Sequence, residues 1–484
     1  MPALTSLGIG SGIDLNTMLT QLVALERKPL EQMQAEASKL QTKVSSFGQI
    51  QSLVSRIQDA ANKLKGTTGS GVWSQSVAKS ANDQVVTAVS GSSAATGSYA
   101  VSVTSLATAQ TIVSGAPYAD ASELIGEGTL TLEVGAWNAD RTAFTAKAGS
   151  TSVALAVTAT DTIGTLRDKI NALGAGVSAS LVTDANGTRL ALRSTATGAV
   201  NGFRITAADA DGVNTDATGL SRVAYDPPGG TTGMLFGQAG ANAVANVNGV
   251  PVNSATNELS GVIDGLTLRL RGNSATPVDV DVSPDREAIT EAVKGLASAY
   301  SDLAKYIGEQ TKYDATSKVG GPLQGDSAVG GVLARLRGVI NNTTGASATF
   351  ARLSDVGLEL QRDGTLSVDS AKLDKALGNL EAMEKAFTNS DPLVPANEGF
   401  ARRFSALATE MLAVDGSLTT RTEGLRKLIT QNSEKQSRLE DRVERYQARM
   451  VQQFTAMDSN LARLNALNSY VTQQLAALTN SSSS

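Results

Sequence analysis

Apolar residues recur every three or four positions near the amino terminus, which predicts helices there. From Leu30 to Lys65 the chain has no proline and one glycine, Gly48, and its apolar residues fall on one helical face. Ahead of this stretch, Asp14 is a predicted N-cap, and Pro29 is expected to end or kink the first helix. That first helix carries Leu15, Met18, Leu19, Leu22 and Leu25.

The carboxyl-terminal segment predicts a longer helix. From Leu425 to Leu478 there is neither glycine nor proline, and apolar residues recur about every 3.5 positions, the period of a coiled-coil seam. A helix packed on its own domain would show the same period, but the length of the pattern and the matching amino-terminal helix favour packing between molecules. The seam comprises Leu439, Val443, Tyr446, Met450, Phe454, Met457, Leu461, Leu464, Leu467, Val471, Leu475 and Leu478.

The middle of the chain alternates toward β-structure, with turn dipeptides at Asn186-Gly187 and Asn248-Gly249. One short helix, Ile163–Leu173, interrupts the strands, a loop is expected at Tyr225–Gly233, and a helix returns from Asp285 to Ile307. The predicted fold is α+β: a helical coiled-coil stalk formed by both termini, with inserted antiparallel β head domains. The expected strands are Gln84–Val89, Ser98–Thr104, Gly128–Val134, Thr151–Val157, Val177–Thr183, Thr188–Arg193, Val244–Val247, Leu266–Leu270 and Val278–Val282.

The composition excludes several classes of function. The chain has no cysteine and no histidine, so Ser-His-Asp and Cys-His catalytic sites, histidine-ligated zinc and disulfides are impossible. Its 41 Lys and Arg nearly balance 46 Asp and Glu, and no basic cluster alternates with aromatic residues, so we expect no nucleic-acid partner. No apolar run is long enough to span a membrane, and the amino terminus does not resemble a Sec or twin-arginine signal.

Three fragments match catalytic or binding motifs only in outline. Ser76–Lys79 fits a Ser-x-x-Lys element without its companion motifs. Gly8–Gly12 has the wrong glycine spacing for a nucleotide loop, and Asp209–Asp216 has no closing glutamate for a calcium loop. We therefore expect no enzymatic activity, cofactor or metal, and a hydrolase is only a distant alternative.

The order of motifs along nearly the whole chain resembles the FliD family of bacterial flagellar filament capping proteins, also called hook-associated protein 2. Asp161–Asn171, followed by Val177–Phe203, is similar to a repeat shared by flagellins and some cap proteins. The segments that carry the resemblance are Leu7–Leu15, Leu19–Leu30, Ser46–Gly48, Asn246–Val250, Asn257–Leu268, Asp285–Leu303, Pro322–Asp326, Leu353–Leu360, Asp363–Asp369 and Tyr446–Leu478.

The resemblance implies a division into domains along the chain. Residues 1–42 and 425–484 would form a terminal coiled-coil domain, and residues 43–75 and 284–424 a helical leg domain. Residues 76–117 and 239–283 would form an inner β head domain, into which residues 118–238 are inserted as an outer β head domain.

The resemblance also implies a function and partners. The protein is expected at the distal tip of the extracellular flagellar filament, as a secreted homo-oligomeric ring, a pentamer or hexamer. It would hold secreted flagellin while that protein folds and inserts. Its other expected partners are the hook-filament junction protein, the flagellar type III export apparatus and a cytoplasmic export chaperone.

We expect self-assembly and filament docking to use the apolar seam, because weakly specific apolar contacts can form and release repeatedly. Val443→Asp or Met457→Asp should then abolish assembly and leave the β head folded. The expected residues are Leu19, Leu22, Leu25, Leu439, Val443, Tyr446, Met450, Phe454, Met457, Leu461 and Leu464.

Two other classes of function remain open. A hook-filament junction protein or a flagellin-like subunit would share the helical termini and the β centre, although the carboxyl-terminal sequence is not typical of flagellin. A surface adhesin acting through the β head is a further alternative, alone or in addition to capping.

Overall fold

The computed structural model describes residues 14–66, 71–91, 94–230, 233–316 and 318–481, with side chains of the last helix described to residue 476. The glycine-rich segment Gly8–Gly12 lies outside the described residues. The chain forms two compact units. We call residues up to 66 together with those from 289 onward the helical unit, and residues 67–288 the β unit.

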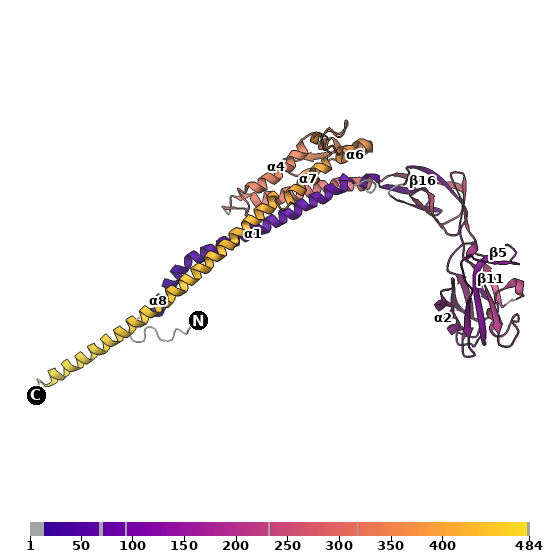
Figure 1. Cartoon of the computed structure of the whole chain (residues 1–484), viewed down its shortest axis with the longest axis horizontal. Helices are drawn as coiled ribbons and strands as arrows, with labels where there is room; N and C mark the ends of the chain where they lie inside the picture. The colour runs from indigo at the N-terminus through magenta and orange to yellow at the C-terminus, as the bar shows by residue number, and fades with distance from the viewer. Residues whose placement is uncertain (1–13, 67–70, 92–93, 231–232, 317, 482–484) are drawn as a thin grey trace. The chain divides into compact units, whose positions relative to one another are not determined.

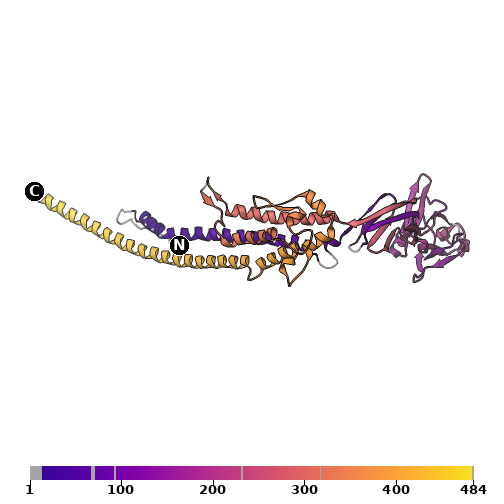
Figure 2. The ribbon, with the colours of Figure 1, turned by 90° about the horizontal axis from the view of Figure 1, so that it is seen from above.

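Two long helices dominate the helical unit, α1 (Leu15–Lys65) and α8 (Ser417–Ser481). They lie side by side in both ribbon views (Figures 1 and 2). The side chain of Asp14 accepts a hydrogen bond from the backbone N–H of Thr17 at 3.0 Å, which confirms the predicted N-cap.

Pro29 does not end the first helix, contrary to one of the two outcomes expected from the sequence, because α1 continues through it. Proline removes one backbone hydrogen bond and costs about 3 kcal/mol in a helix interior. Apolar contacts with α8 on both sides of Pro29, at Leu22 and Leu30, help to offset this loss.

Shorter elements pack around the pair of long helices. The returning helix α3 begins at Arg286, close to the position expected from the sequence. The remaining helices and strands of this unit are α3 (Arg286–Thr311), β17 (Tyr313–Asp314), β18 (Val319–Gly320), α4 (Ser327–Asn341), η5 (Leu353–Val356), β19 (Leu358–Leu360), β20 (Leu366–Val368), α5 (Ser370–Ala376), α6 (Leu380–Thr388), η6 (Pro395–Asn397) and α7 (Phe400–Leu412).

The β unit contains two separate apolar cores. The first core lies between a five-stranded sheet ordered β1-β16-β3-β12-β13 and a three-stranded sheet ordered β14-β15-β2. We call this part the inner head. Its elements are η1 (Val72–Ser74), β1 (Ser76–Ser80), β2 (Val86–Ser90), β3 (Gly97–Ser105), β12 (Ala243–Val247), β13 (Val250–Ser254), β14 (Glu258–Ile263), β15 (Leu266–Leu270) and β16 (Ser274–Pro284).

The second core belongs to a part that we call the outer head. Strand β5 pairs with β6, β7 and β10 in one sheet, and a second sheet is ordered β11-β4-β9-β8. Its elements are β4 (Thr111–Ser114), β5 (Gly128–Trp137), β6 (Phe144–Ala146), β7 (Val153–Val157), α2 (Ile163–Leu173), β8 (Val177–Asp184), β9 (Gly187–Ser194), η2 (Ala199–Asn201), β10 (Gly202–Asp209), η3 (Gly219–Val223), η4 (Pro227–Gly229) and β11 (Met234–Gln238).

Local sequence explains several of these elements. Asn248 and Gly249 both have positive φ angles, 51° and 87°, and connect β12 to β13 as the two-residue hairpin predicted from this dipeptide. A reciprocal capping box between Thr162 and Thr165 begins α2, and Gly174 in the left-handed region ends it. Helix Ile163–Leu173 is confirmed with the predicted bounds.

Two features differ from the expected layout. The domain division implied by the resemblance places residues 76–117 in the inner head, but strand β4 (Thr111–Ser114) within them pairs with β9 and β11 of the outer head. The expected domain boundaries after residues 42 and 424 fall inside the continuous helices α1 and α8. Within the described residues, no helix combines the length and the apolar character needed to cross a membrane.

Candidate assembly surface

The predicted seam residues of α1 and α8 meet within one chain. Leu15, Leu19 and Val23 of α1 form a buried cluster with Leu439, Val443 and Phe454 of α8, and Leu22, Leu30, Met33, Met450 and Val451 pack around it. We call these residues the packed seam. This part of the apolar pattern therefore reflects packing within the protein, the alternative that the period alone left open.

Polar contacts show how the two helices are aligned. The Gln436 side-chain amide donates to the Met33 carbonyl at 3.4 Å and to Asn432 Oδ1 at 2.5 Å. Farther along α8, Arg442 lies 3.9 Å from the Glu26 carboxylate. Residue numbers thus rise along α8 as they fall along α1, and the two helices run antiparallel.

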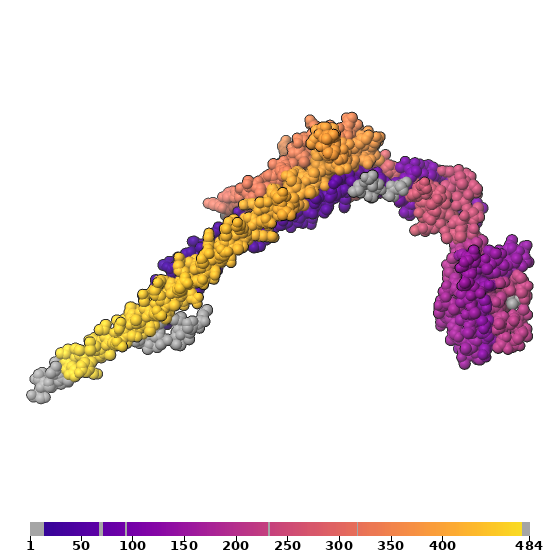
Figure 3. All heavy atoms as spheres, in the orientation of Figure 1, coloured from indigo at the N-terminus to yellow at the C-terminus, as the bar shows by residue number. Residues whose placement is uncertain are grey.

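Beyond Phe454 the apolar residues of α8 become exposed. Met457 is 37% exposed, Leu464 59% and Tyr470 59%, whereas Leu461 is half-buried. We call the exposed apolar residues Leu464, Leu467, Tyr470, Val471 and Leu475 the distal row. In Figure 3, no other described segment lies against the yellow end of α8 on the face in view.

Two predicted site residues lie elsewhere on the helix surfaces. Leu25 is 61% exposed and does not join the packed seam. Tyr446 is half-buried, and the Arg449 guanidinium lies 5.8 Å from the centre of its ring. Such a contact is a cation–π interaction, which leaves less of the ring available to a partner.

The sequence-based site omitted several residues of the packed seam. Leu15, Val23, Leu30, Met33 and Val451 contribute to the cluster. The signal for them was present, because Leu15 and Met33 follow the same three- and four-residue spacing as Leu19 and Leu22. Their inclusion requires the relative register of α1 and α8, which the sequence pattern does not provide.

The charge distribution divides α8 into two parts. Between Glu434 and Arg449 the exposed surface of α8 is densely charged, whereas Arg463 is the only charged residue after Asp458. An exposed apolar row with so little charge beside it is typical of a surface that packs against other protein. The distal row can thus bind through apolar contact.

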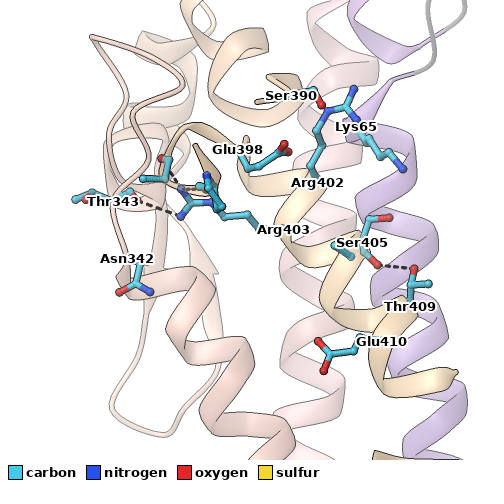
Figure 4. Close-up of a pocket in the computed structure, with 13 residues that line it drawn as sticks. Lys65, Asn342, Thr343, Ser390, Glu398, Arg402, Arg403, Ser405, Thr409 and Glu410 are labelled. Atoms are coloured by element: carbon cyan, nitrogen blue, oxygen red, sulfur yellow. Dashed lines mark hydrogen bonds between the residues drawn. The ribbon is translucent and has the colours of Figure 1, made fainter. Parts of the chain in front are cut away.

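A cavity of about 990 Å³ lies in the helical unit between α7, the end of α1 and neighbouring loops (Figure 4). Its arginines are engaged in structural contacts. Arg403 donates to the backbone carbonyls of Thr343 at 3.0 Å and Ala396 at 2.7 Å, and Arg402 Nε donates to the Thr388 carbonyl at 2.5 Å. These guanidinium groups connect loops to α7.

The other motif fragments also have structural roles. Ser76–Ser80 forms strand β1, and the Ser76 hydroxyl donates to the Gly91 carbonyl. The Asp209 carboxylate accepts from the backbone N–H and the hydroxyl of Ser221. It therefore holds the turn that follows β10.

Comparison with known proteins shows that most of the chain matches models of one protein family. The family model "Flagellar hook-associated protein 2 C-terminus" matches residues 240–466, and its N-terminus counterpart matches residues 11–110. A third model, "Flagellin hook IN motif", matches residues 143–196, which include α2 and the whole β8–β9 hairpin.

Similar proteins extend over the full length. The chain is 30% identical to the B-type flagellar hook-associated protein 2 of Pseudomonas aeruginosa, with 98% of each chain covered. It is 28% identical to flagellar hook-associated protein 2 of Escherichia coli K12, with 99% of this chain and 100% of the relative covered. The D1-D2-D3 domains of the E. coli flagellar cap protein FliD share the fold, with a TM-score of 0.58 and 24% identity over 79% of this chain and 99% of that one.

Proposed function

Because the chain belongs to the flagellar hook-associated protein 2 family, whose members cap the flagellar filament, we propose that it acts at the filament tip through the apolar residues of α8. The protein is a filament cap that supports flagellin assembly. Members of this family are structural proteins of the flagellum. Among the described residues, the exposed apolar surface of α8 supports an assembly role.

The observation that carries the proposal is the change in burial along α8. The packed seam holds α1 and α8 together, whereas the distal row leaves Leu464, Leu467 and Leu475 between 57% and 60% exposed. Burying such side chains is worth about 1.5–3 kcal/mol each. The row therefore favours contact with other protein, in a family whose members assemble at a filament.

We assign different roles to the two parts of the predicted site, one within the subunit and one in contacts between proteins. Leu19, Leu22, Leu439, Val443, Met450 and Phe454 would maintain the helix pair within each subunit. Met457, Leu461 and Leu464, together with the rest of the distal row, would contact flagellin or neighbouring subunits at the filament tip. Leu25 and Tyr446 would contribute only at the periphery of these contacts.

The same proposal includes the number of subunits, the route of secretion and the other partner proteins. The subunits would form a pentameric or hexameric ring, secreted by the flagellar type III export apparatus after release from a cytoplasmic chaperone. The hook-filament junction protein would precede the cap on the growing structure. A chain without cysteine is compatible with passage in an unfolded state, since no disulfide has to be broken or formed.

The test is deletion of the gene in its own organism, followed by measurement of flagellin as filaments on the cell and as monomer in the medium. We expect monomer in the medium, and filaments restored by the intact gene. Normal filaments in the deletion strain would contradict the cap function and favour another axial role.

Complementation with altered genes then tests the surface. Leu464→Asp places a charge in the distal row, and we expect it not to restore filaments. Ser469→Asp places the same charge on an exposed residue of the same helix outside that row, and we expect it to restore them. Equal behaviour of the two variants would contradict the role of the distal row without affecting the cap function.

A further inference from the structure

Two successive helices, α7 and α8, pack along α1, and the chain leaves the helical conformation between them. Helix α7 ends at Leu412 and α8 begins at Ser417. On α7, the Ser405 hydroxyl donates to Asn62 Oδ1 at 2.8 Å and Thr409 accepts from Gln58 at 2.7 Å. On α8, Gln436 contacts Met33. Both helices therefore run antiparallel to α1.

The four connecting residues leave the helical path. Val414 is 85% exposed, although it lies between two helices with buried apolar residues. At Gly416 a Cβ atom would lie 2.5–2.8 Å from the carbonyl oxygens of Glu410, Met411 and Ala413. Since no real Cβ atom approaches backbone so closely, the interruption requires glycine at this position.

Helix α1 has a position of low helix propensity in the stretch between its contacts with α7 and α8. Gly48 is the single glycine of α1, and it falls between Gln58 and Met33, the residues that contact α7 and α8. Glycine in a helix interior costs about 1 kcal/mol relative to alanine. No atom outside its own helix turn lies within 4 Å of the position of a Cβ at Gly48, so close packing does not require glycine there.

Helix α4 spans the interruption and is connected to both sides by ion pairs. Arg335 of α4 pairs with Glu410 of α7. Asp326, the N-cap of α4, accepts from Arg421 of α8, with Oδ2 2.7 Å from Nη2 and 3.1 Å from Nε. The Asp326 side chain is only 4% exposed, whereas the Arg335–Glu410 pair is largely exposed.

An open cavity of about 710 Å³ adjoins the interruption, lined by residues that include Arg335, Asp415 and Gly424. Close packing would resist relative movement of α7 and α8, because protein interiors have few voids. Here the cavity leaves room for such movement, and the ion pairs beside it are directional contacts that fix one arrangement.

We propose that residues 413–416 and Gly48 form a hinge in the helical unit, held in one setting by the Asp326–Arg421 ion pair. The interruption and Gly48 both lie between the contacts of α1 with α7 and those with α8, and α4 acts as the brace across the interruption. Loss of Arg421 removes the tie to α8 and leaves the Asp326 carboxylate without its main charged partner, which destabilises the braced arrangement. The inference concerns the chain itself and does not rest on the proposed function.

The absence of cysteine allows a direct test with the full-length protein. Ser298→Cys on α3 and Ser437→Cys on α8 are exposed positions on the two sides of the hinge. Spin labels on both, diluted with excess unlabelled protein so that only distances within one chain are measured, report the distribution of distances by pulsed electron paramagnetic resonance.

We expect Arg421→Ala to broaden this distribution clearly, and Arg442→Ala to leave it unchanged. Arg442 is a matched control, because it makes a long, exposed ion pair with Glu26 elsewhere on α8. Gly48→Ala in the Arg421→Ala background should narrow the distribution again, because alanine stiffens α1 at that level.

Circular dichroism of each variant checks that helical content is retained. Equal distributions in the parent and in Arg421→Ala would overturn the proposal. A broad distribution that Gly48→Ala does not narrow would also overturn it, since the movement would then not involve α1. If Arg421→Ala loses helical content, Gly48→Ala in the parent background decides alone: narrowing supports the hinge, and an unchanged width contradicts it.

Discussion

Asp161 shows how a single residue stabilises the outer head. Its carboxylate accepts hydrogen bonds from the Thr158 backbone and hydroxyl at 2.7 and 2.9 Å, from the Thr165 hydroxyl at 3.0 Å and from Lys169 at 2.5 Å. Burial alone would raise the pKa of Asp161, but Lys169 and the threonine donors outweigh it and hold this pKa well below its usual range. The carboxylate thus connects the end of β7 to α2.

Asp161→Asn should lower the free energy of unfolding of the β unit by about 1.5–3 kcal/mol, the range for hydrogen bonds to a charged group. Both tryptophans, Trp73 and Trp137, lie in the β unit. Denaturant unfolding followed by tryptophan fluorescence therefore measures this unit selectively. Asp168→Asn, at an exposed carboxylate paired with Arg167 on the same helix, is the control and should change stability by less than about 0.5 kcal/mol.

The same carboxylate predicts a dependence of stability on pH. Because the folded-state pKa of Asp161 is depressed, its stabilisation is fully present above the unfolded-state value of about 4 and is lost as pH falls below that value. Fluorescence-detected stability should therefore fall less steeply below about pH 4 in Asp161→Asn than in the parent. Parallel pH curves would show that the carboxylate is not stabilised in this way.

At the scale of single residues, the sequence predicted local features such as caps and turns, but it did not predict which side chains are buried. The N-cap role of Asp14 and the turn at Asn248-Gly249 depend only on neighbouring residues, and both were predicted. The burial of Asp161 depends on the packing of α2 against β7 and β8. No pattern around residue 161 indicates that packing.

Among the elements, helix α8 has one continuous row of apolar residues, of which the first part is buried against α1 and the last part is exposed. Val443 is 3% exposed against α1, whereas Leu464 is 59% exposed. The sequence predicted the seam and part of its residues but not the point at which burial ends. That point depends on how far α1 accompanies α8, which requires the antiparallel register given by Gln436 and Arg442.

Aspartate substitutions at these two positions should therefore have different effects. Val443→Asp buries an unpaired charge and should destabilise the α1–α8 pair by about 3–5 kcal/mol, with loss of assembly as a consequence. Leu464→Asp should leave thermal unfolding of the helices within about 0.5 kcal/mol of the parent and still reduce assembly. Met457→Asp, at a residue 37% exposed, should fall between them.

Circular dichroism melting measures the helical stability of these variants, and sedimentation velocity measures assembly. In all three, tryptophan fluorescence should report a folded β unit. Normal assembly of Leu464→Asp would exclude the distal row from the interface. Unchanged melting of Val443→Asp would mean that the packed seam does not stabilise the helical unit.

Over the whole molecule, the outer head is inserted through two adjacent chain segments. Thr108 and Ala241 exchange backbone hydrogen bonds of 2.9 and 3.1 Å at the point where the chain enters and leaves it. The inner core includes residues up to Ala107 and from Ala243 onward. The family resemblance implied this insertion, but its boundary at residue 118 left β4 in the inner head, because strand pairing between distant segments is not visible in the sequence.

Replacement of residues 109–240 by Asn-Gly should accordingly leave the inner head folded, because this dipeptide closes a two-residue hairpin between Thr108 and Ala241. We expect unchanged melting of the helical unit and a native-like fluorescence signal from Trp73. Size-exclusion chromatography and circular dichroism check that the shortened protein is monodisperse and retains its helices. Loss of cooperative unfolding, as followed by Trp73 fluorescence, would contradict this prediction and would mean that the inner core depends on the outer head.

The antiparallel pairing of α1 with α8 has a consequence for the order in which the chain acquires its structure. Met33 and Gln436 are 403 residues apart, so α1 is synthesised long before its partner exists. The β unit lies entirely between them and can form from contacts within residues 67–288. Until the last segment emerges, the apolar residues of α1 between Leu15 and Met33 lack their partners on α8, so synthesis from the amino terminus leaves the joining of the two ends as the final event.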